Sequence, residues 1–194
     1  MARGAAAHAK FLDELLIFRE LSFAFAAKHE ATLSRDAFDA LPAWAQATLA
    51  AHAGDARRSP RRAPAALAAL ESADSGDAAW DAMQRCLLRH GELHNNLRMT
   101  WGKAVLAWAP TPRLALEWLL RLNDRYALDG SDPNSYAGVL WCLGGFDGPK
   151  AVATTAVTGS IRPRSTSKHK GILARYAALV DGNYPEPRLE YGAA

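Results

Sequence analysis

The stretch His94–Trp108, HNNLRMTWGKAVLAW, decides the fold class and raises the question of function. Trp101 and Trp108 are seven residues apart, which is two turns of an α-helix, so both rings share one helix face. Aromatic residues at this spacing most often belong to a core. The polar side chains of Asn95, Asn96 and Arg98 come directly before the stripe and favour a site beside that core.

Helical periodicity continues outward from this stretch in both directions. Residues typical of helix ends bound the segments: Asp77 and Gly91 around one, Thr111 and Pro112 before another, and Asp132 before a third. The sequence predicts helices over 11–30, 42–54, 65–72, 77–90, 94–108, 112–128, 135–143 and 168–180, with loops over 55–64 and 150–167. No β alternation and no internal repeat appear, so the prediction is one all-α domain over residues 1–194.

Composition narrows the class of protein. The 194 residues contain no run of 18 apolar residues, which argues against a membrane span, and the N-terminus does not resemble a signal peptide. Cys86 and Cys142 stand in no metal or redox spacing and fit reduced thiols of a cytoplasmic protein. Basic residues cluster at 57–62 (RRSPRR) and over 148–180, where no acid occurs. Such clusters attract polyanions, although a solvated loop and tail is the commoner explanation.

The sequence contains no glycine-rich phosphate loop, zinc spacing or serine nucleophile turn. Three other constellations remain, and for each a purely structural role is commoner. Trp80, Trp101 and Trp108 could pass an electron in short hops if their rings lie close together. Arg98 and Asp129 could form an ion pair that positions a ligand or ties two helices. Glu14 and Phe18, four residues apart on a helix, could recognise a base by hydrogen bonding and stacking.

Several stretches resemble the photolyase/cryptochrome family, and within it the class II cyclobutane pyrimidine dimer photolyases. They are FLDELLIFREL (11–21), LPAWAQATLAAHAGDAR (41–57), the opening stretch, and LNDRYALDGSDPNSYAGVLWCLGGFDGP (122–149). The resemblance is strongest over residues 11–149. It weakens through the loop-rich segment 150–167, where TGSIRPRST (158–166) matches a family segment, and residues 181–194 form a tail.

The resemblance implies a helical domain that binds FAD. In that family the reduced flavin, excited by light, gives an electron to a pyrimidine dimer flipped out of DNA, and the dimer splits. The implied activity is therefore that of a deoxyribodipyrimidine photo-lyase, a carbon–carbon lyase that repairs DNA. Photolyases are usually more than twice as long, and the antenna domain and the FAD phosphate-binding segment have no counterpart here. We therefore expect a truncated FAD-binding domain with impaired FAD binding unless a second chain completes it. A non-catalytic remnant that binds DNA or flavin, and a cryptochrome-like photoreceptor, are the alternatives.

The resemblance also implies roles for individual residues. Lesion and DNA contacts fall on Glu14, Phe18, Asn95, Asn96, Trp141, Arg162 and Arg164. Contacts with FAD fall on Arg98, Met99, Asn123, Asp129, Gly130, Asp132 and Asn134. Catalytic roles fall on Glu14, which would hydrogen-bond the dimer, on Asn123, which would face flavin N5, and on the electron relay of Trp80, Trp101 and Trp108. Asn134 is a second candidate for the N5 position. Phe18 replaces a Trp, and Thr100 a Tyr, that many relatives have.

Overall fold

The computed structural model describes residue 9 and residues 12–33, 36–57 and 66–169, and every regular element in these residues is helical. This confirms the all-α prediction. In chain order the elements are the π-helix η1 (Asp13–Phe18), α2 (Arg19–Leu33), the 3-10 helix η2 (Ala37–Ala40), α3 (Ala43–Ala51), α4 (Ala66–Glu71), α5 (Ala78–His90), α6 (Asn95–Trp108), α7 (Pro112–Tyr126), α8 (Pro133–Cys142) and the 3-10 helix η3 (Thr166–His169). Within these ranges, no helix combines the length and the apolar character needed to cross a bilayer.

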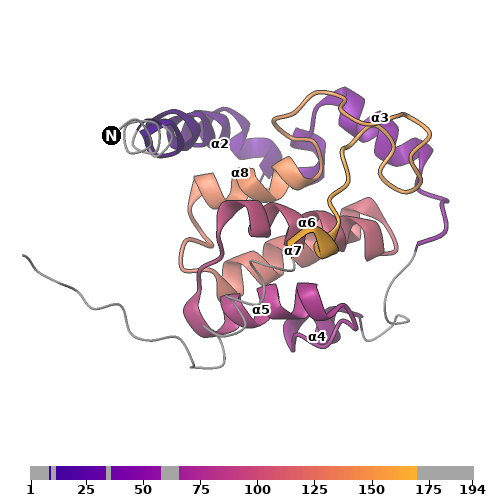
Figure 1. Cartoon of the computed structure of the whole chain (residues 1–194). Helices are drawn as coiled ribbons and strands as arrows, with labels where there is room; N and C mark the ends of the chain where they lie inside the picture. The colour runs from indigo at the N-terminus through magenta and orange to yellow at the C-terminus, as the bar shows by residue number, and fades with distance from the viewer. Residues whose placement is uncertain (1–8, 10–11, 34–35, 58–65, 170–194) are drawn as a thin grey trace, which may run out of the picture.

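Helix α6 lies in the middle of the structure, beside α7, with α5 and α4 on one side and α8 and α2 on the other (Figure 1). The residues from Thr100 to Leu106 are all buried, because α5, α7 and α8 surround this part of α6. Where α6 meets α8, a Cβ atom on Gly102 would lie 2.5 Å from the Sγ atom of Cys142. The two helices therefore approach at a point where only glycine fits.

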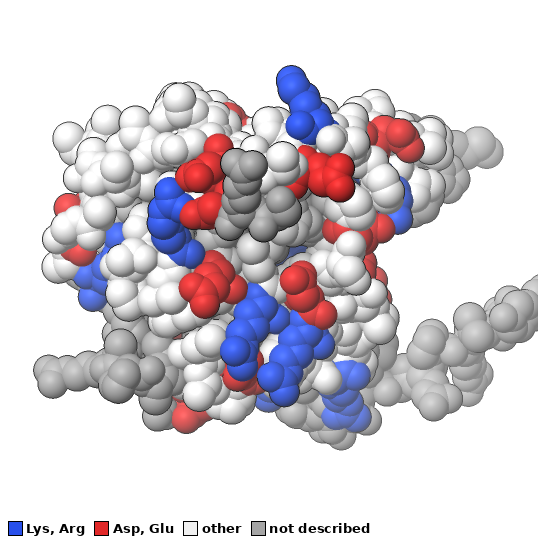
Figure 2. Space-filling model, turned by 180° about the vertical axis from the view of Figure 1, so that it is seen from behind, with Lys and Arg blue, Asp and Glu red and all other residues white. Residues whose placement is uncertain are grey.

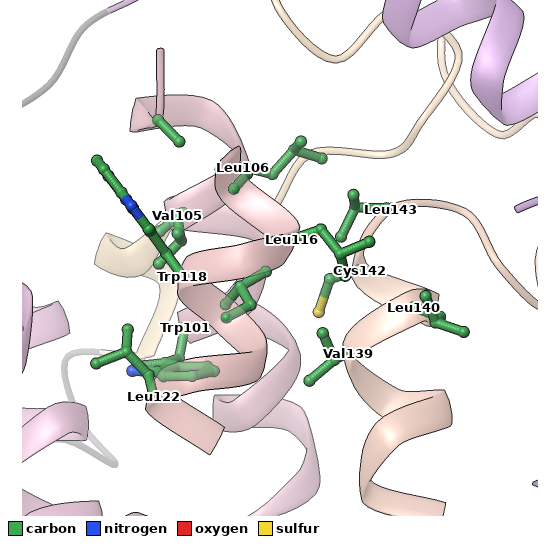
Figure 3. Close-up of a cluster of buried hydrophobic side chains, with 14 of the residues drawn as sticks. Trp101, Val105, Leu106, Leu116, Trp118, Leu122, Val139, Leu140, Cys142 and Leu143 are labelled. Atoms are coloured by element: carbon green, nitrogen blue, oxygen red, sulfur yellow. The ribbon is translucent and has the colours of Figure 1, made fainter. Parts of the chain in front are cut away.

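One cluster of buried apolar side chains forms the core, and α3 and α5 contribute to it as well as α6, α7 and α8. Around α6, side chains from one face of α7 and from the end of α8 pack against its buried face. Figure 3 shows this cluster with Trp101, Val105, Leu106, Leu116, Trp118, Leu122, Val139, Leu140, Cys142 and Leu143 labelled. The core thus fixes α6, α7 and α8 relative to one another, and these helices carry most of the site residues.

The helix ends follow the signals in the sequence. A carboxylate oxygen of Asp77 accepts hydrogen bonds from the backbone N–H groups of Ala79 and Trp80, both at 3.0 Å, at the start of α5. Gly91 ends this helix with φ at 68°, in the left-handed region that favours glycine. The hydroxyl of Thr111 caps α7 in the same way. These contacts set where α5 ends and α7 begins.

The N-terminal helix differs from the prediction. One α-helix was expected over 11–30, but the chain forms the π-helix η1 and then α2, which ends at Leu33. None of the η1 residues is buried, and Ser22 is the buried residue of α2. With few packing contacts to select the helix type, the apolar spacing alone did not indicate a π-helix. Most of the helix expected over 168–180, and the arginines at 58, 61 and 62, lie outside the described residues.

Residues 150–161 form the predicted loop, and they pack against the end of α3 (Figure 1). The Nε2 atom of His52 lies 2.7 Å from the carbonyl oxygen of Ala153, and its Nδ1 atom lies 2.7 Å from Asp55 Oδ2. Both ring nitrogens face acceptors, so this arrangement requires the doubly protonated imidazolium. The hydrogen bond that His52 donates to the Asp55 carboxylate is the largest cause that raises the pKa of His52. Asp55 also accepts the N–H of Val157 at 2.8 Å, which fixes the loop a second time.

Candidate functional site

A pocket of about 490 Å³ opens between η1 and α2, the first turns of α6, α8, and the segment that precedes η3. It brings together most of the site residues predicted from the sequence. Those that line it are Glu14, Phe18, Asn95, Asn96, Arg98, Met99, Asp129, Asn134, Trp141, Arg162 and Arg164. These residues are far apart in the sequence, so their convergence depends on the fold.

Two aromatic rings form one part of the pocket wall. The rings of Phe18 and Trp141 lie 5.7 Å apart between centroids and are inclined by 50°. Trp141 also packs against Phe146, at 5.5 Å. The hydroxyl of Ser22 donates a hydrogen bond of 3.2 Å to Asn134 Oδ1 and so ties α2 to α8 next to these rings. Flat apolar surfaces of this kind can stack against planar groups such as bases.

The guanidinium group of Arg98 connects three segments at the pocket. Its Nη1 atom donates to both carboxylate oxygens of Asp129, at 2.8 and 3.0 Å, which is the ion pair expected from the sequence. Its Nη2 atom donates to the hydroxyl of Ser135 at 2.7 Å and to Asn123 Oδ1. The Arg98 side chain is 21% exposed and that of Asp129 is 44% exposed. The pair therefore lies at the pocket surface and not in the dry core.

Three predicted cofactor residues do not reach the pocket surface. Asn123 is 1% exposed and lies behind Arg98, and its amide donates to the carbonyl oxygen of Gly130 at 3.0 Å. Gly130 is itself buried. Asp132 caps α8 through the N–H of Asn134 at 2.8 Å and pairs with Arg19 at 2.5 Å. Their hydrogen-bonding groups are engaged within the protein, so these residues support the pocket wall from behind.

Lys103 lines the pocket and was missed in the sequence. It lies on α6 seven residues after Asn96, and this spacing on one helix face was the available signal. The side chain is buried, with 6% of the residue exposed, and its Nζ atom donates to the carbonyl oxygen of Arg162 at 2.9 Å. Burial lowers the pKa of Lys103. This contact holds the segment that carries Arg162 and Arg164 against α6.

The pocket carries an excess of positive charge. The basic lining residues are Arg98, Lys103, Lys150, Arg162 and Arg164, and the acidic ones are Glu14, Asp129 and Asp147. Asp129 pairs with Arg98, and Asp147 pairs with Lys150. On the face seen in Figure 2, basic and acidic side chains lie next to one another and form no large patch of one sign. The excess at the pocket therefore favours an anionic ligand there.

The three tryptophan rings expected to form a series are in contact. Trp80 stacks on Trp101, with centroids 6.0 Å apart and planes inclined by 9°, and it meets Trp108 edge to face at 5.8 Å. Trp80 and Trp101 are 0% and 1% exposed, whereas Trp108 is only partly buried. Trp101 also lines a small crevice together with Arg98 and Met99, which border the pocket. The order is therefore Trp101 behind the pocket wall, Trp80 in the middle and Trp108 towards the surface.

Comparison with known proteins gives consistent results, although no family model matches the chain. It is 41% identical over 153 residues to a deoxyribodipyrimidine photo-lyase of Methanothermobacter thermautotrophicus, which covers 79% of this chain and 32% of the relative. It is 39% identical over 154 residues to a protein of the same name from Potorous tridactylus, covering 78% of this chain and 27% of the relative. A rice relative of the same name is 36% identical over 135 residues, which is 70% of this chain and 25% of the relative. The chain spans about a third or less of the length of these relatives. With this identity over 70–79% of its length and the all-α architecture, the chain corresponds to a part of photolyase-family proteins.

Proposed function

We propose that the chain carries the catalytic part of a deoxyribodipyrimidine photolyase, which repairs cyclobutane pyrimidine dimers in DNA with light and reduced FAD. The observation that carries the proposal is the meeting of two groups of residues in one pocket. The first group is Glu14, Phe18 and Trp141, which suit a base lesion, and the second is the Arg98–Asp129 pair, which suits a flavin ring. The names of the relatives agree with this assignment.

The residues present fit the ring end of FAD. A flavin ring is planar and offers carbonyl oxygens and ring nitrogens as acceptors. The pocket offers the amide donors of Asn95 and Asn134, beside Met99 and the planar guanidinium of Arg98. When bound, reduced FAD supplies the electron that light drives onto the dimer. FAD also carries two phosphates that need further donors. We therefore expect weak binding of FAD by this chain unless additional donors, for example from a second chain, meet the phosphates.

Each residue on the proposed lesion side of the pocket has one proposed role. Glu14 would accept or donate hydrogen bonds at the dimer bases, and Phe18 and Trp141 would stack against them. Arg162 and Arg164 would contact DNA phosphates, with Asn96 beside them, because Arg164 already donates to the Asn96 carbonyl oxygen at 3.3 Å. DNA containing a pyrimidine dimer is the proposed partner, and the cytoplasm the proposed compartment.

The tryptophan series would refill the flavin with electrons. Each ring contacts the next, and the series runs from the pocket towards the surface. A light-dependent receptor of the cryptochrome type would use the same series, so the DNA experiment below distinguishes repair from signalling.

The test is a titration with matched duplexes, one containing a single cyclobutane dimer and one without it, at two salt concentrations. We expect tighter binding to the damaged duplex and affinity that falls steeply with salt. Replacing both Arg162 and Arg164 with Ala is expected to weaken binding to both duplexes and to reduce the slope of log K against log salt by about 2. Glu14→Gln is the matched control, and it is expected to reduce only the preference for damage.

Two outcomes would overturn the proposal. A DNA affinity that does not change with salt concentration would show that Arg162 and Arg164 do not contact phosphates. Equal affinity for both duplexes would leave a non-specific DNA-binding remnant of the family. Repair itself is measured as loss of dimers under blue light with reduced FAD in excess over the protein, against a dark control.

A further inference from the structure

A buried glutamine beside the tryptophan series has no role in the pocket described above. Gln84 lies on α5, four residues after Trp80, and is 0% exposed. Its Oε1 atom accepts a hydrogen bond from the indole N–H of Trp101 at 2.9 Å. An indole N–H can only donate, so the oxygen and not the nitrogen of the amide must face it.

The other end of the same amide is unsatisfied. Among the described residues, the Nε2 atom of Gln84 is buried and has no hydrogen-bond partner. A methionine would fill a similar volume without an unsatisfied amide, but it would leave the buried indole N–H of Trp101 without its acceptor. The glutamine thus satisfies the indole and leaves its own amide donor unpaired. Stability favours neither residue clearly, and a buried unsatisfied group of this kind calls for another explanation, such as a redox role.

The second buried indole also faces a neutral acceptor. The N–H of Trp80 donates to the backbone carbonyl oxygen of Trp101 at 2.9 Å. The nearby carboxylate of Asp81 is turned elsewhere, because its Oδ1 atom accepts the N–H of Ser75 at 2.8 Å. In the described part of the chain, neither indole hydrogen-bonds to a titratable side chain.

We infer that Gln84 is a positioning residue for electron transfer, which holds the indole of Trp101 and keeps its proton in place when the ring is oxidised. This inference rests on the relay in the proposed function. Loss of one electron from an indole gives a radical cation whose N–H is a much stronger acid than before. An amide oxygen is too weak a base to take that proton, so the proton stays on Trp101.

The proton that stays allows the positive charge to move on. One electron passes from Trp80 to Trp101, the Trp101 ring is restored, and no proton has to return to it. A carboxylate at position 84 would instead take the Nε1 proton and leave a neutral radical on Trp101. The charge would then stop there, because refilling the ring would require the proton to come back. The oxidant is a one-electron photo-oxidant at the pocket, either an excited flavin or a metal complex attached there.

The experiment uses the full chain with Trp44, Trp118 and Trp141 replaced by Phe, which leaves three of the six tryptophans. A ruthenium polypyridyl complex is attached to a cysteine introduced at the pocket, Asn95→Cys, so that oxidation starts at the Trp101 end of the series. It is flash-excited with a sacrificial acceptor, and transient absorption distinguishes the cationic from the neutral tryptophan radical. In this background we expect the cationic form and transfer along the series. With Gln84→Glu, we expect the neutral form to appear and transfer to be lost as the pH rises through the pKa of the new carboxyl.

A second variant measures the hydrogen bond without oxidation. In Gln84→Met the indole proton resonance of Trp101 is expected to move upfield in the NMR spectrum of ¹⁵N-tryptophan-labelled protein, while that of Trp80 stays in place. An unchanged Trp101 resonance would overturn the inference even if Gln84→Glu did not fold. Identical, pH-independent radical spectra in the background and in Gln84→Glu would overturn it as well.

The relay is tested separately by Trp80→Phe. Unchanged arrival of the charge at Trp108 in that variant would remove the relay from the proposed function. It would leave the NMR result for Gln84 as an independent observation, so the two failures are distinguishable.

Discussion

Removal of the Arg98 side chain tests how the pocket is held together. In Arg98→Ala the protein loses the hydrogen bonds of the guanidinium to Asp129, Ser135 and Asn123. Breaking a fully buried ion pair costs about 3–5 kcal/mol, because the partner charge is left without water or a counter-charge. Asp129 is 44% exposed, so water can solvate its carboxylate after the change. The expected loss of unfolding free energy is therefore smaller.

Asn123, a second partner of Arg98, reduces the expected loss of unfolding free energy further. The hydroxyl of Ser135 donates to Asn123 Oδ1 at 3.0 Å and still satisfies this oxygen in the variant. What remains is the loss of charge-assisted hydrogen bonds, for which we expect about 2–3 kcal/mol. For a chain of 194 residues this corresponds to a fall in melting temperature of roughly 4–12 °C.

The assay is urea unfolding followed by circular dichroism, with the melting temperature as a second measure. Asp129→Asn is the matched control, because it keeps an acceptor for Arg98 and removes only the charge, and we expect a loss below about 1 kcal/mol. A loss below about 0.5 kcal/mol in Arg98→Ala would show that the guanidinium is solvated and not part of the network. A loss above about 5 kcal/mol would show that the site is buried, contrary to the exposure of Asp129.

Three further predictions concern the loop and the thiols. The pKa of His52 is raised from 6.5 in the folded protein. The stabilisation from its hydrogen bond to Ala153 is therefore complete below pH 6.5, and it is lost as the pH rises through the pKa of the folded state. The difference in melting temperature between the protein and His52→Gln is expected to shrink as the pH rises through that pKa. Gly159→Ala is expected to destabilise by about 1–3 kcal/mol, measured by urea unfolding, because φ is +51° and the new Cβ would lie 2.7 Å from the His52 ring. Burial raises the pKa of both thiols, that of Cys142 to about 11, so Cys86 and Cys142 are expected to react with an aromatic disulfide reagent only when the protein unfolds.

The sequence predicted the helices best where a cap and a period agreed. Asp77, Thr111 and Asp132 each cap the helix expected after them. The ends of the helices were predicted less accurately. The helix predicted to end at residue 128 ends at Tyr126, because the sequence carries no strong stop signal there. The π-helix η1 could not be predicted, because apolar spacing does not distinguish a π-turn from an α-turn over six residues.

The site was predictable as a set of residues and not as a geometry. The family motifs gave Glu14 and Trp141, and the fold brings both to the pocket. The sequence did not indicate how deeply each residue is buried. Asn123 was therefore expected at the ligand, but it lies behind Arg98. Gln84 carries no motif at all. Its contact depends on the register between α5 and α6, which is a tertiary property.

The close approach of α6 and α8 at Gly102 sets how far apart the walls of the pocket lie. Trp141 and Cys142 are neighbours at the end of α8, and Cys142 rests on Gly102 of α6, the helix that also presents Arg98. One added methyl group at position 102 would act as a wedge and push the aromatic wall away from the guanidinium. The distance between the proposed lesion side and the proposed flavin side is thus set from inside the core, by the absence of a side chain at position 102. Selection for a wider or narrower pocket is therefore expected to act on the residue at position 102 as well as on the residues that line the pocket.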